Sequence, residues 1–213
     1  MNSQLLNIPI DRIHIEAMLE MPAEPIGIVL LAHGSGSSRH SPRNIRVAHL
    51  LRQRNIATLL PDLLTLTETL DYHTRFDIHL LTHRLLAVTR WVKLHTPPTR
   101  NLPIAYFGAH TGAAAALQAA SALGDDIKAV VSRGGRPDLA GRQDLVRVNA
   151  PTLLLVGSRD EEVLELNRAA YARLPCTKEL SVIPGASHLF EEAGTLDEAA
   201  RQAAAWFVQY FKP

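Results

Sequence analysis

The segment IAYFGAHTGAAAALQAA, residues 104–120, decides the fold of this chain. Its first four residues are apolar or aromatic, which predicts a buried strand. The Ala-rich run that begins at Thr111 predicts a helix, because alanine loses no side-chain entropy there. Gly108 and Gly112 stand in the turn between strand and helix. Without Cβ atoms they would let the two elements approach closely and push the central side chain, His110, out above the sheet.

Strands and helices are expected to alternate on both sides of this segment. Residues 26–32 are apolar or glycine throughout, which is typical of a central strand covered by helices on both faces of a sheet. Further strands are expected at 56–60, 127–131, 152–156 and 179–183, and helices at 44–54, 75–94, 162–173 and 196–211. Loops are expected at 62–73 and 132–150. Two apolar-rich runs, 4–8 and 13–19, predict an opening hairpin.

This alternation predicts an α/β fold. We expect a mostly parallel twisted sheet with helices on both faces and an N-terminal antiparallel hairpin. The length of 213 residues favours a single domain over residues 1–213. Ligands of such folds bind at the carboxyl ends of the strands.

The charge balance favours a small-molecule partner. The chain has 22 basic and 21 acidic residues and no long basic run, so nucleic acid is not expected as a partner. The apolar run 28–32 is far shorter than the roughly 20 residues that cross a bilayer, so no membrane association is expected. Cys176 is the single cysteine, and the opening residues lack the order of a signal peptide. We therefore expect a cytoplasmic protein, and the sequence leaves its oligomeric state open.

Three further segments stand just past predicted strands. HGSGSS, residues 33–38, follows the central strand, and GSRDEE, residues 157–162, and PGASH, residues 184–188, follow the last two strands. Together with the elbow, their order along the chain is elbow residue, acid, histidine. This set of motifs resembles the α/β-hydrolase superfamily, and within it the small, lid-free members similar to dienelactone hydrolases. The resemblance extends over essentially the whole chain.

The resemblance implies a nucleophile elbow at His110, where this superfamily carries serine. Asp160 matches the acid and His188 the general base of a catalytic triad. The backbone N–H groups of Ser35 and Thr111 match the positions of an oxyanion hole. The implied activity is hydrolysis of small carboxylic esters or lactones, and no cofactor is implied.

Each of these motifs also has a simpler interpretation. Asp160 would serve as an N-cap, since a helix is expected to follow at once. His188 would be an ordinary loop histidine. The HGSGSS loop would be a phosphate cradle, although it lacks the lysine of a P-loop and the third glycine of a dinucleotide motif. The sequence leaves these interpretations open beside the catalytic one.

A histidine at the elbow excludes an unmodified serine-hydrolase mechanism, because no hydroxyl is there to acylate. Three interpretations stay open. His110 acts as nucleophile or base on activated esters. Alternatively, it replaces the nucleophile in a catalytically silent protein that binds a small ligand. In the third, it belongs to an engineered metal-dependent site with His79 and His83, which lie four residues apart on a predicted helix. No third ligand is evident, so we assign no metal ligands. Ten histidines in 213 residues fit a natural chain and an engineered variant alike.

The substrate pocket is expected to be open and modest in size. The connection 132–150 is too short for a lid domain, which favours small esters or lactones over lipids. Gly34 is expected to contact the substrate. Arg133 and Arg136 would bind a carboxylate or phosphate on the substrate. The alternative is that both are solvent-exposed loop arginines without a role.

Overall fold

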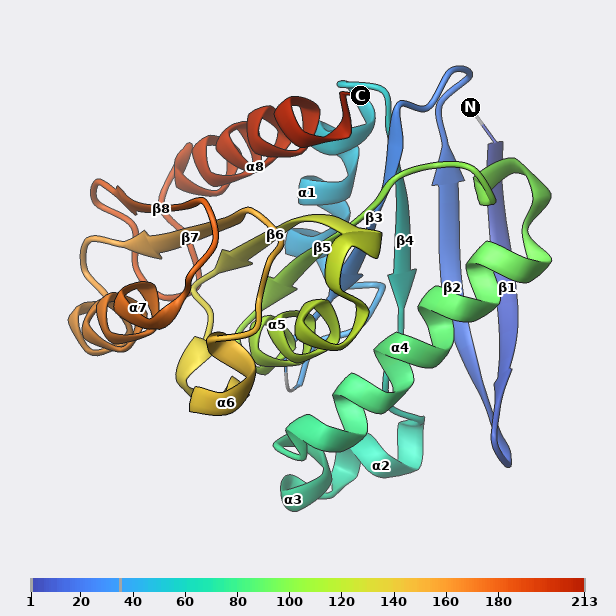
Figure 1. Ribbon diagram of the computed structural model, residues 1–213, viewed down its shortest axis with the longest axis horizontal. Helices are drawn as coiled ribbons and strands as arrows, with labels where there is room; N and C mark the ends of the chain where they lie inside the picture. Colours follow the sequence, from blue (N-terminus) through green and yellow to red (C-terminus); the bar gives the residue numbers. More distant parts are fainter. Residues whose placement is uncertain (1, 35, 213) are drawn as a thin grey trace.

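An eight-stranded sheet forms the centre of the protein (Figure 1). The structure is a computed structural model, and it describes residues 2–34 and 36–212. The strand order is β1-β2-β4-β3-β5-β6-β7-β8. β1 (Asn2–Ile10) and β2 (Ile13–Met21) form the predicted antiparallel hairpin, and β2 also pairs antiparallel with β4 (Ile56–Pro61). All other pairs are parallel, which confirms the predicted fold class. Their strands are β3 (Gly27–Ala32), β5 (Ile104–Ala109), β6 (Ile127–Arg133), β7 (Thr152–Gly157) and β8 (Lys178–Ile183).

Helices cover both faces of the sheet (Figure 1). α1 (Pro42–Arg52) and α8 (Thr195–Phe211) pack on one face, and α4 (Ile78–His95), α5 (Thr111–Leu123) and α7 (Glu161–Arg173) on the other. The central strand β3 shows why its sequence is apolar throughout. Its residues alternate between the two cores, with Leu30 packed under α4 and α5 and Leu31 under α1 and α8. None of the described helices is long and apolar enough to cross a membrane.

The segment 62–73, expected to be a loop, contains the short helix α2 (Leu66–Leu70) and the start of a second one, α3 (Tyr72–Arg75). A capping box starts α2: Glu68 N donates to Thr65 Oγ1 at 3.3 Å, and Thr65 N donates to Glu68 Oε2 at 2.8 Å. Arg84 of α4 donates to both carboxylate oxygens of Glu68, at 2.5 and 2.6 Å. The Thr-x-x-Glu signature was present in the sequence, but the segment is too short for its helical periodicity to be visible.

The connection 132–150 is also more ordered than expected. β6 continues through Arg133, and the short helices η3 (Pro137–Ala140) and α6 (Arg142–Leu145) follow. Two further short helices, η1 (Pro97–Thr99) and η2 (Gly124–Asp126), link longer elements. The connection therefore forms part of the wall over α5 and carries no lid domain.

Candidate active site

The elbow between β5 and α5 has the sharp geometry that its glycines predict. His110 has φ 51° and ψ −122°, a sparsely populated backbone conformation for a residue with a side chain. A Cβ on Gly108 would lie 2.4 Å from Ala113 Cα, and one on Gly112 would lie 2.1 Å from the Ala32 carbonyl oxygen. Only glycine fits these two positions, and the close packing around them keeps His110 at the carboxyl edge of the sheet.

His188 and Asp160 come together at this same edge, past β8 and β7. Nδ1 of His188 lies 2.6 Å from Oδ2 of Asp160, so Nδ1 donates its proton to the carboxylate and Nε2 keeps its lone pair. Asp160 stands at the N-cap position of α7, as one interpretation expected, but its side chain makes no hydrogen bond to the first turn of that helix. The carboxylate instead orients the imidazole.

The rings of His110 and His188 face each other. Their centroids are 5.6 Å apart in an edge-to-face arrangement, and Phe76 packs against the other side of His110 at 5.9 Å. Burial lowers the pKa of His110, and the charge that His188 gains when protonated and the charge of Arg136 lower it further. His110 is therefore held in its neutral form, in which one ring nitrogen has a lone pair.

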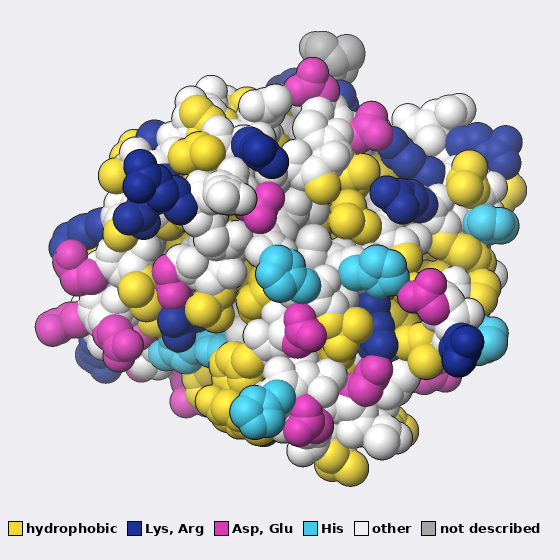
Figure 2. All heavy atoms as spheres, turned by 60° about the horizontal axis from the view of Figure 1, so that its bottom comes forward, with side chains coloured by type: hydrophobic (Ala, Val, Ile, Leu, Met, Phe, Trp, Pro, Cys, Tyr) yellow, Lys and Arg dark blue, Asp and Glu magenta, His cyan; other side chains and the backbone are white. Residues whose placement is uncertain are grey.

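A cavity of about 330 Å³ opens beside this pair of histidines. Figure 2 looks onto the carboxyl edge of the sheet, where histidine side chains gather on the surface among charged groups. The residues that line the cavity come from both sides of the elbow: Gly34, Ser37, Arg43, Asn44, Phe76, Ala109, His110, Arg133, Gly134, His188 and Leu189. Its size suits a small molecule.

One of the two predicted oxyanion positions, Thr111, lies at the elbow. Thr111 is the first residue of α5 and is fully buried. Ser35 lies outside the described residues. Gly34 packs on the elbow so closely that a Cβ there would lie 2.6 Å from the Cβ of His110. The loop after β3 thus reaches the candidate site, and the donor roles of Ser35 and Thr111 stay predictions.

The two candidate arginines differ from the expectation that both lie in a loop. Arg133 is the last residue of β6 and is only 8% exposed, and it lines the cavity. Arg136 directs its guanidinium to Asp138, with contacts at 2.9 and 2.7 Å, and is not among the described residues that line the cavity. Its backbone N–H donates to the His110 carbonyl at 3.0 Å. Arg133 therefore lines the site, whereas Arg136 supports the elbow with its backbone.

The histidines of the metal interpretation lie on an exposed face of α4. His79 and His83 are both exposed, and His83 Nδ1 lies 3.9 Å from Asp11 Oδ2. Within residues 2–34 and 36–212, no three His, Cys, Asp or Glu side chains are grouped so that they could hold a metal ion.

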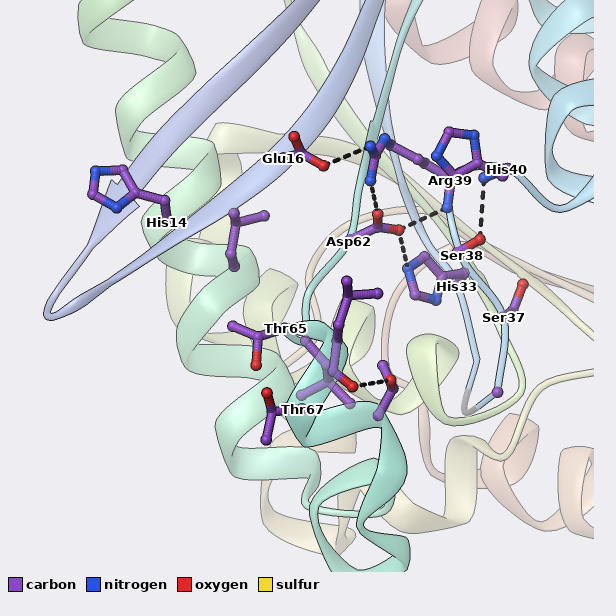
Figure 3. Close-up of a pocket in the computed structure, with 15 residues that line it drawn as sticks. His14, Glu16, His33, Ser37, Ser38, Arg39, His40, Asp62, Thr65 and Thr67 are labelled. Atoms are coloured by element: carbon purple, nitrogen blue, oxygen red, sulfur yellow. Dashed lines mark hydrogen bonds and ion pairs between the residues drawn. The ribbon is translucent and has the colours of Figure 1, made fainter.

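A second, larger cavity of about 760 Å³ lies past β3 and β4, and our sequence analysis did not find it. Figure 3 shows Asp62 between His33 and Arg39, with Glu16 on the other side of Arg39. Asp62 Oδ1 accepts from the Arg39 backbone N–H at 2.7 Å and lies 3.3 Å from His33 Nε2, and Asp62 Oδ2 binds the Arg39 guanidinium. Burial would raise the pKa of Asp62, but the contacts with His33 and Arg39 outweigh it and hold the pKa below its ordinary value.

The signal for this cluster was available in the sequence. His33 directly follows β3 and Asp62 directly follows β4, and these strands are parallel neighbours. The rule that carboxyl ends of parallel strands meet would have brought the two residues together. The cluster ties the loop that carries Gly34 to the end of β4.

Comparison with known proteins finds relatives by sequence and by fold. No protein-family model matches the chain. A Mycobacterium tuberculosis protein that carries the provisional name phosphoribosyl transferase is 55% identical over 192 residues, which are 90% of this chain but 43% of that protein. This chain thus spans less than half the length of the curated relatives it matches.

Solved structures match the chain over nearly its full length. A dienelactone hydrolase from Anabaena variabilis is 48% identical with a TM-score of 0.93, over 98% of both chains. Est1E from Butyrivibrio proteoclasticus shares the fold, with a TM-score of 0.83 at 17% identity, over 98% of this chain and 99% of its own. Because the first of these is covered almost completely at high identity, this chain belongs to the α/β-hydrolase superfamily, in the family of the Anabaena dienelactone hydrolase.

Proposed function

We propose that this chain hydrolyses small carboxylic esters or lactones, with His110 as nucleophile or general base and His188 as the proton carrier. One observation carries the proposal: the rings of His110 and His188 lie 5.6 Å apart beside a cavity, and Asp160 orients the second ring. The neutral form of His110, favoured by burial, has the lone pair that either role needs.

In the covalent route, a ring nitrogen of His110 attacks the ester carbonyl carbon. The tetrahedral intermediate collapses when the bond to the leaving oxygen breaks, which gives an acyl-imidazolium and an alkoxide or phenolate. Water then attacks the acyl carbon while Nε2 of His188 takes its proton, and the acyl–nitrogen bond breaks to restore neutral His110. Because the leaving oxygen departs before it is protonated, this route favours activated esters.

In the base route, His110 takes the proton of a water molecule that attacks the ester directly. No acyl–enzyme bond forms. One oxygen of the product acid comes from the ester and the other from the water. The two routes share the neutral imidazole and differ in one measurable species. An acyl adduct on His110, detected by mass spectrometry of protein quenched during turnover, would identify the covalent route.

The experiment for the proposed function is hydrolysis of p-nitrophenyl acetate by this chain, by His110→Ala and by His110→Ser. Free imidazole at the same concentration serves as the chemical reference. We expect the chain to exceed free imidazole and His110→Ala to lose that advantage. A rate no greater than that of imidazole, unchanged in His110→Ala, would overturn the proposal.

A second candidate function is ligand binding without turnover. The observation that favours it is the position of His110, which lines the cavity. Its imidazole would occupy space in which an ester carbonyl would otherwise lie. In that case His110→Ser restores a hydroxyl beside the His188–Asp160 pair and gains esterase activity, while the unaltered chain stays silent. The same three proteins therefore distinguish the two functions.

A further inference from the structure

Arg133 is a buried cation at the edge of the candidate site, and no carboxylate among residues 2–34 and 36–212 forms an ion pair with it. Its side chain is 8% exposed, and within the described part of the chain Nε and Nη1 are buried without a hydrogen-bond partner. The guanidinium lies 5.5 Å from the centre of the Phe190 ring, a contact that offers no acceptor. Burial lowers the pKa of Arg133 to about 10, and the charge of Arg43 contributes, yet the group remains charged at neutral pH. An unpaired buried charge lowers stability, and an anionic ligand would compensate the charge of this guanidinium.

The sheet register directs Arg133 to the reacting groups. Arg133 of β6 pairs with Ala109 of β5, the residue directly before His110. Arg133 also lines the cavity of about 330 Å³ together with His110, His188 and Arg43. A ligand that meets this guanidinium is thereby placed beside both imidazoles.

The charge of the cavity favours an anion with two negative charges. Among the described residues that line it there are two arginines and no aspartate or glutamate. Arg43 is 37% exposed, and its nearest carboxylate contact, with Glu191, is 3.5 Å long between two solvent-exposed groups. A weak exposed contact of this kind leaves the Arg43 charge available to a ligand. A single carboxylate would compensate one guanidinium, whereas a phosphate monoester would compensate two.

We propose that the substrate of this site carries a phosphate group, and that Arg133, assisted by Arg43, binds that phosphate beside His110. The inference rests on the proposed function, because the bond that is cleaved remains the carboxylic ester or lactone bond. The phosphate acts as the group by which the substrate is held. Guanidinium groups suit this task because their planar fork matches phosphate oxygens.

The test is binding of inorganic phosphate to the whole chain, followed by ³¹P NMR line broadening and by calorimetry. The variants are Arg133→Met, Arg133→Lys and Arg43→Met, and Arg147→Met is the matched control because it removes an arginine from an exposed position outside the cavity. Circular dichroism and thermal unfolding check that each variant folds. Acetate, titrated in the same way, represents the carboxylate alternative.

We expect phosphate to bind the unaltered chain and Arg147→Met equally. Arg133→Met should weaken binding by at least about tenfold, and Arg133→Lys should weaken it less, since lysine keeps the charge but loses the fork. Arg43→Met should weaken phosphate binding less than Arg133→Met does, because Arg43 is more exposed. If Arg133→Met does not fold, the test rests on Arg133→Lys, whose Kd for phosphate should be higher than that of the unaltered chain.

Three results would overturn the proposal: no phosphate binding to the unaltered chain, binding that Arg133→Met or Arg133→Lys leaves unchanged, or acetate binding as tight as that of phosphate. Binding is measured without turnover, so it separates this inference from the proposed function. Phosphate binding to a chain that hydrolyses no ester would support the site alone. Ester hydrolysis without phosphate binding would support the activity and overturn the site.

Discussion

The two histidine–aspartate pairs of this molecule, His188–Asp160 and His33–Asp62, stand at the same sheet edge but are built differently. Asp160 meets Nδ1 of His188 at 2.6 Å, within the described residues Nε2 of that ring has no hydrogen-bond partner, and His188 lines the cavity. His33 has contacts at both nitrogens: Nδ1 lies 3.2 Å from the Gly34 carbonyl oxygen, and Nε2 lies 3.3 Å from Asp62.

Exposure follows the same division. The His188 side chain is 37% exposed and that of His33 is 8% exposed. A histidine with one nitrogen anchored and the other open can carry a proton, whereas one engaged on both sides holds its loop in place. The same two residue types therefore serve chemistry in one pair and architecture in the other.

The largest effect that tests this division is on catalysis. We expect His188→Gln to lower the rate of p-nitrophenyl acetate hydrolysis by about 10²- to 10⁴-fold, because general acid–base catalysis contributes that much. His33→Gln is the matched variant and should lose far less activity. Equal losses in the two variants would show that the pairs do not differ in role.

The second effect is on the free energy of unfolding, and here His33→Gln should have a larger effect than His188→Gln. His33→Gln should lower the free energy of unfolding by about 1 to 3 kcal/mol, because Asp62 would lose a buried partner. His188→Gln should lower it by less than about 1 kcal/mol, since its ion pair is partly exposed. Urea unfolding of both variants measures the difference, and a greater loss in His188→Gln would contradict it.

The capping box of α2 offers a smaller effect that depends on pH. The hydrogen bond from Arg84, with those from Thr65, lowers the pKa of Glu68 to about 2. Because this pKa is lower in the folded chain than in the unfolded chain, the stabilisation is complete above the ordinary value near 4.5 and is lost as the pH falls towards 2. Glu68→Gln should therefore lower the free energy of unfolding by about 1 to 2 kcal/mol at pH 7.

Urea unfolding at pH 7 and pH 3 checks this expectation for Glu68. The difference between the unaltered chain and Glu68→Gln should shrink at the lower pH. A difference that stays constant would show that the carboxylate charge of Glu68 contributes nothing, and that only the shape of the capping box matters.

The smallest effect concerns His110, the third histidine at this edge. Burial, with the charge that His188 gains when protonated and the charge of Arg136, lowers its pKa below the ordinary value of 6.5. Because this pKa is lower in the folded chain than in the unfolded chain, the neutral ring makes its full contribution to the free energy of unfolding above pH 6.5. That contribution is lost as the pH falls through the lowered pKa. Histidine NMR titration should place the midpoint of His110, assigned with His110→Asn, below 6.5. A midpoint above 6.5 would mean that the ring is not held neutral.

Much of this architecture was predictable because its signals are local. The apolar strands, the amphipathic helices and the glycines of the elbow act through neighbouring residues, so the alternation of β and α elements and the sharp turn at His110 followed from the sequence. The order of the motifs past β5, β7 and β8 also placed Asp160 and His188 in one site, because parallel strands end at one edge. The helices α2 and α3 were missed because each is far shorter than the roughly 11 residues over which helical periodicity can be recognised.

The sequence by itself determined the class of fold, the elbow and the residue types available at the sheet edge. Only the tertiary structure decided how each one is used. Arg133 was expected in a loop, either to bind substrate or to be exposed, and it is a buried strand residue, because the length of β6 is set by pairing with β5 and β7. His33 became a structural residue because β4 brings Asp62 beside it. Burial and the distance between residues far apart in the chain depend on packing, and packing is not written in any one segment.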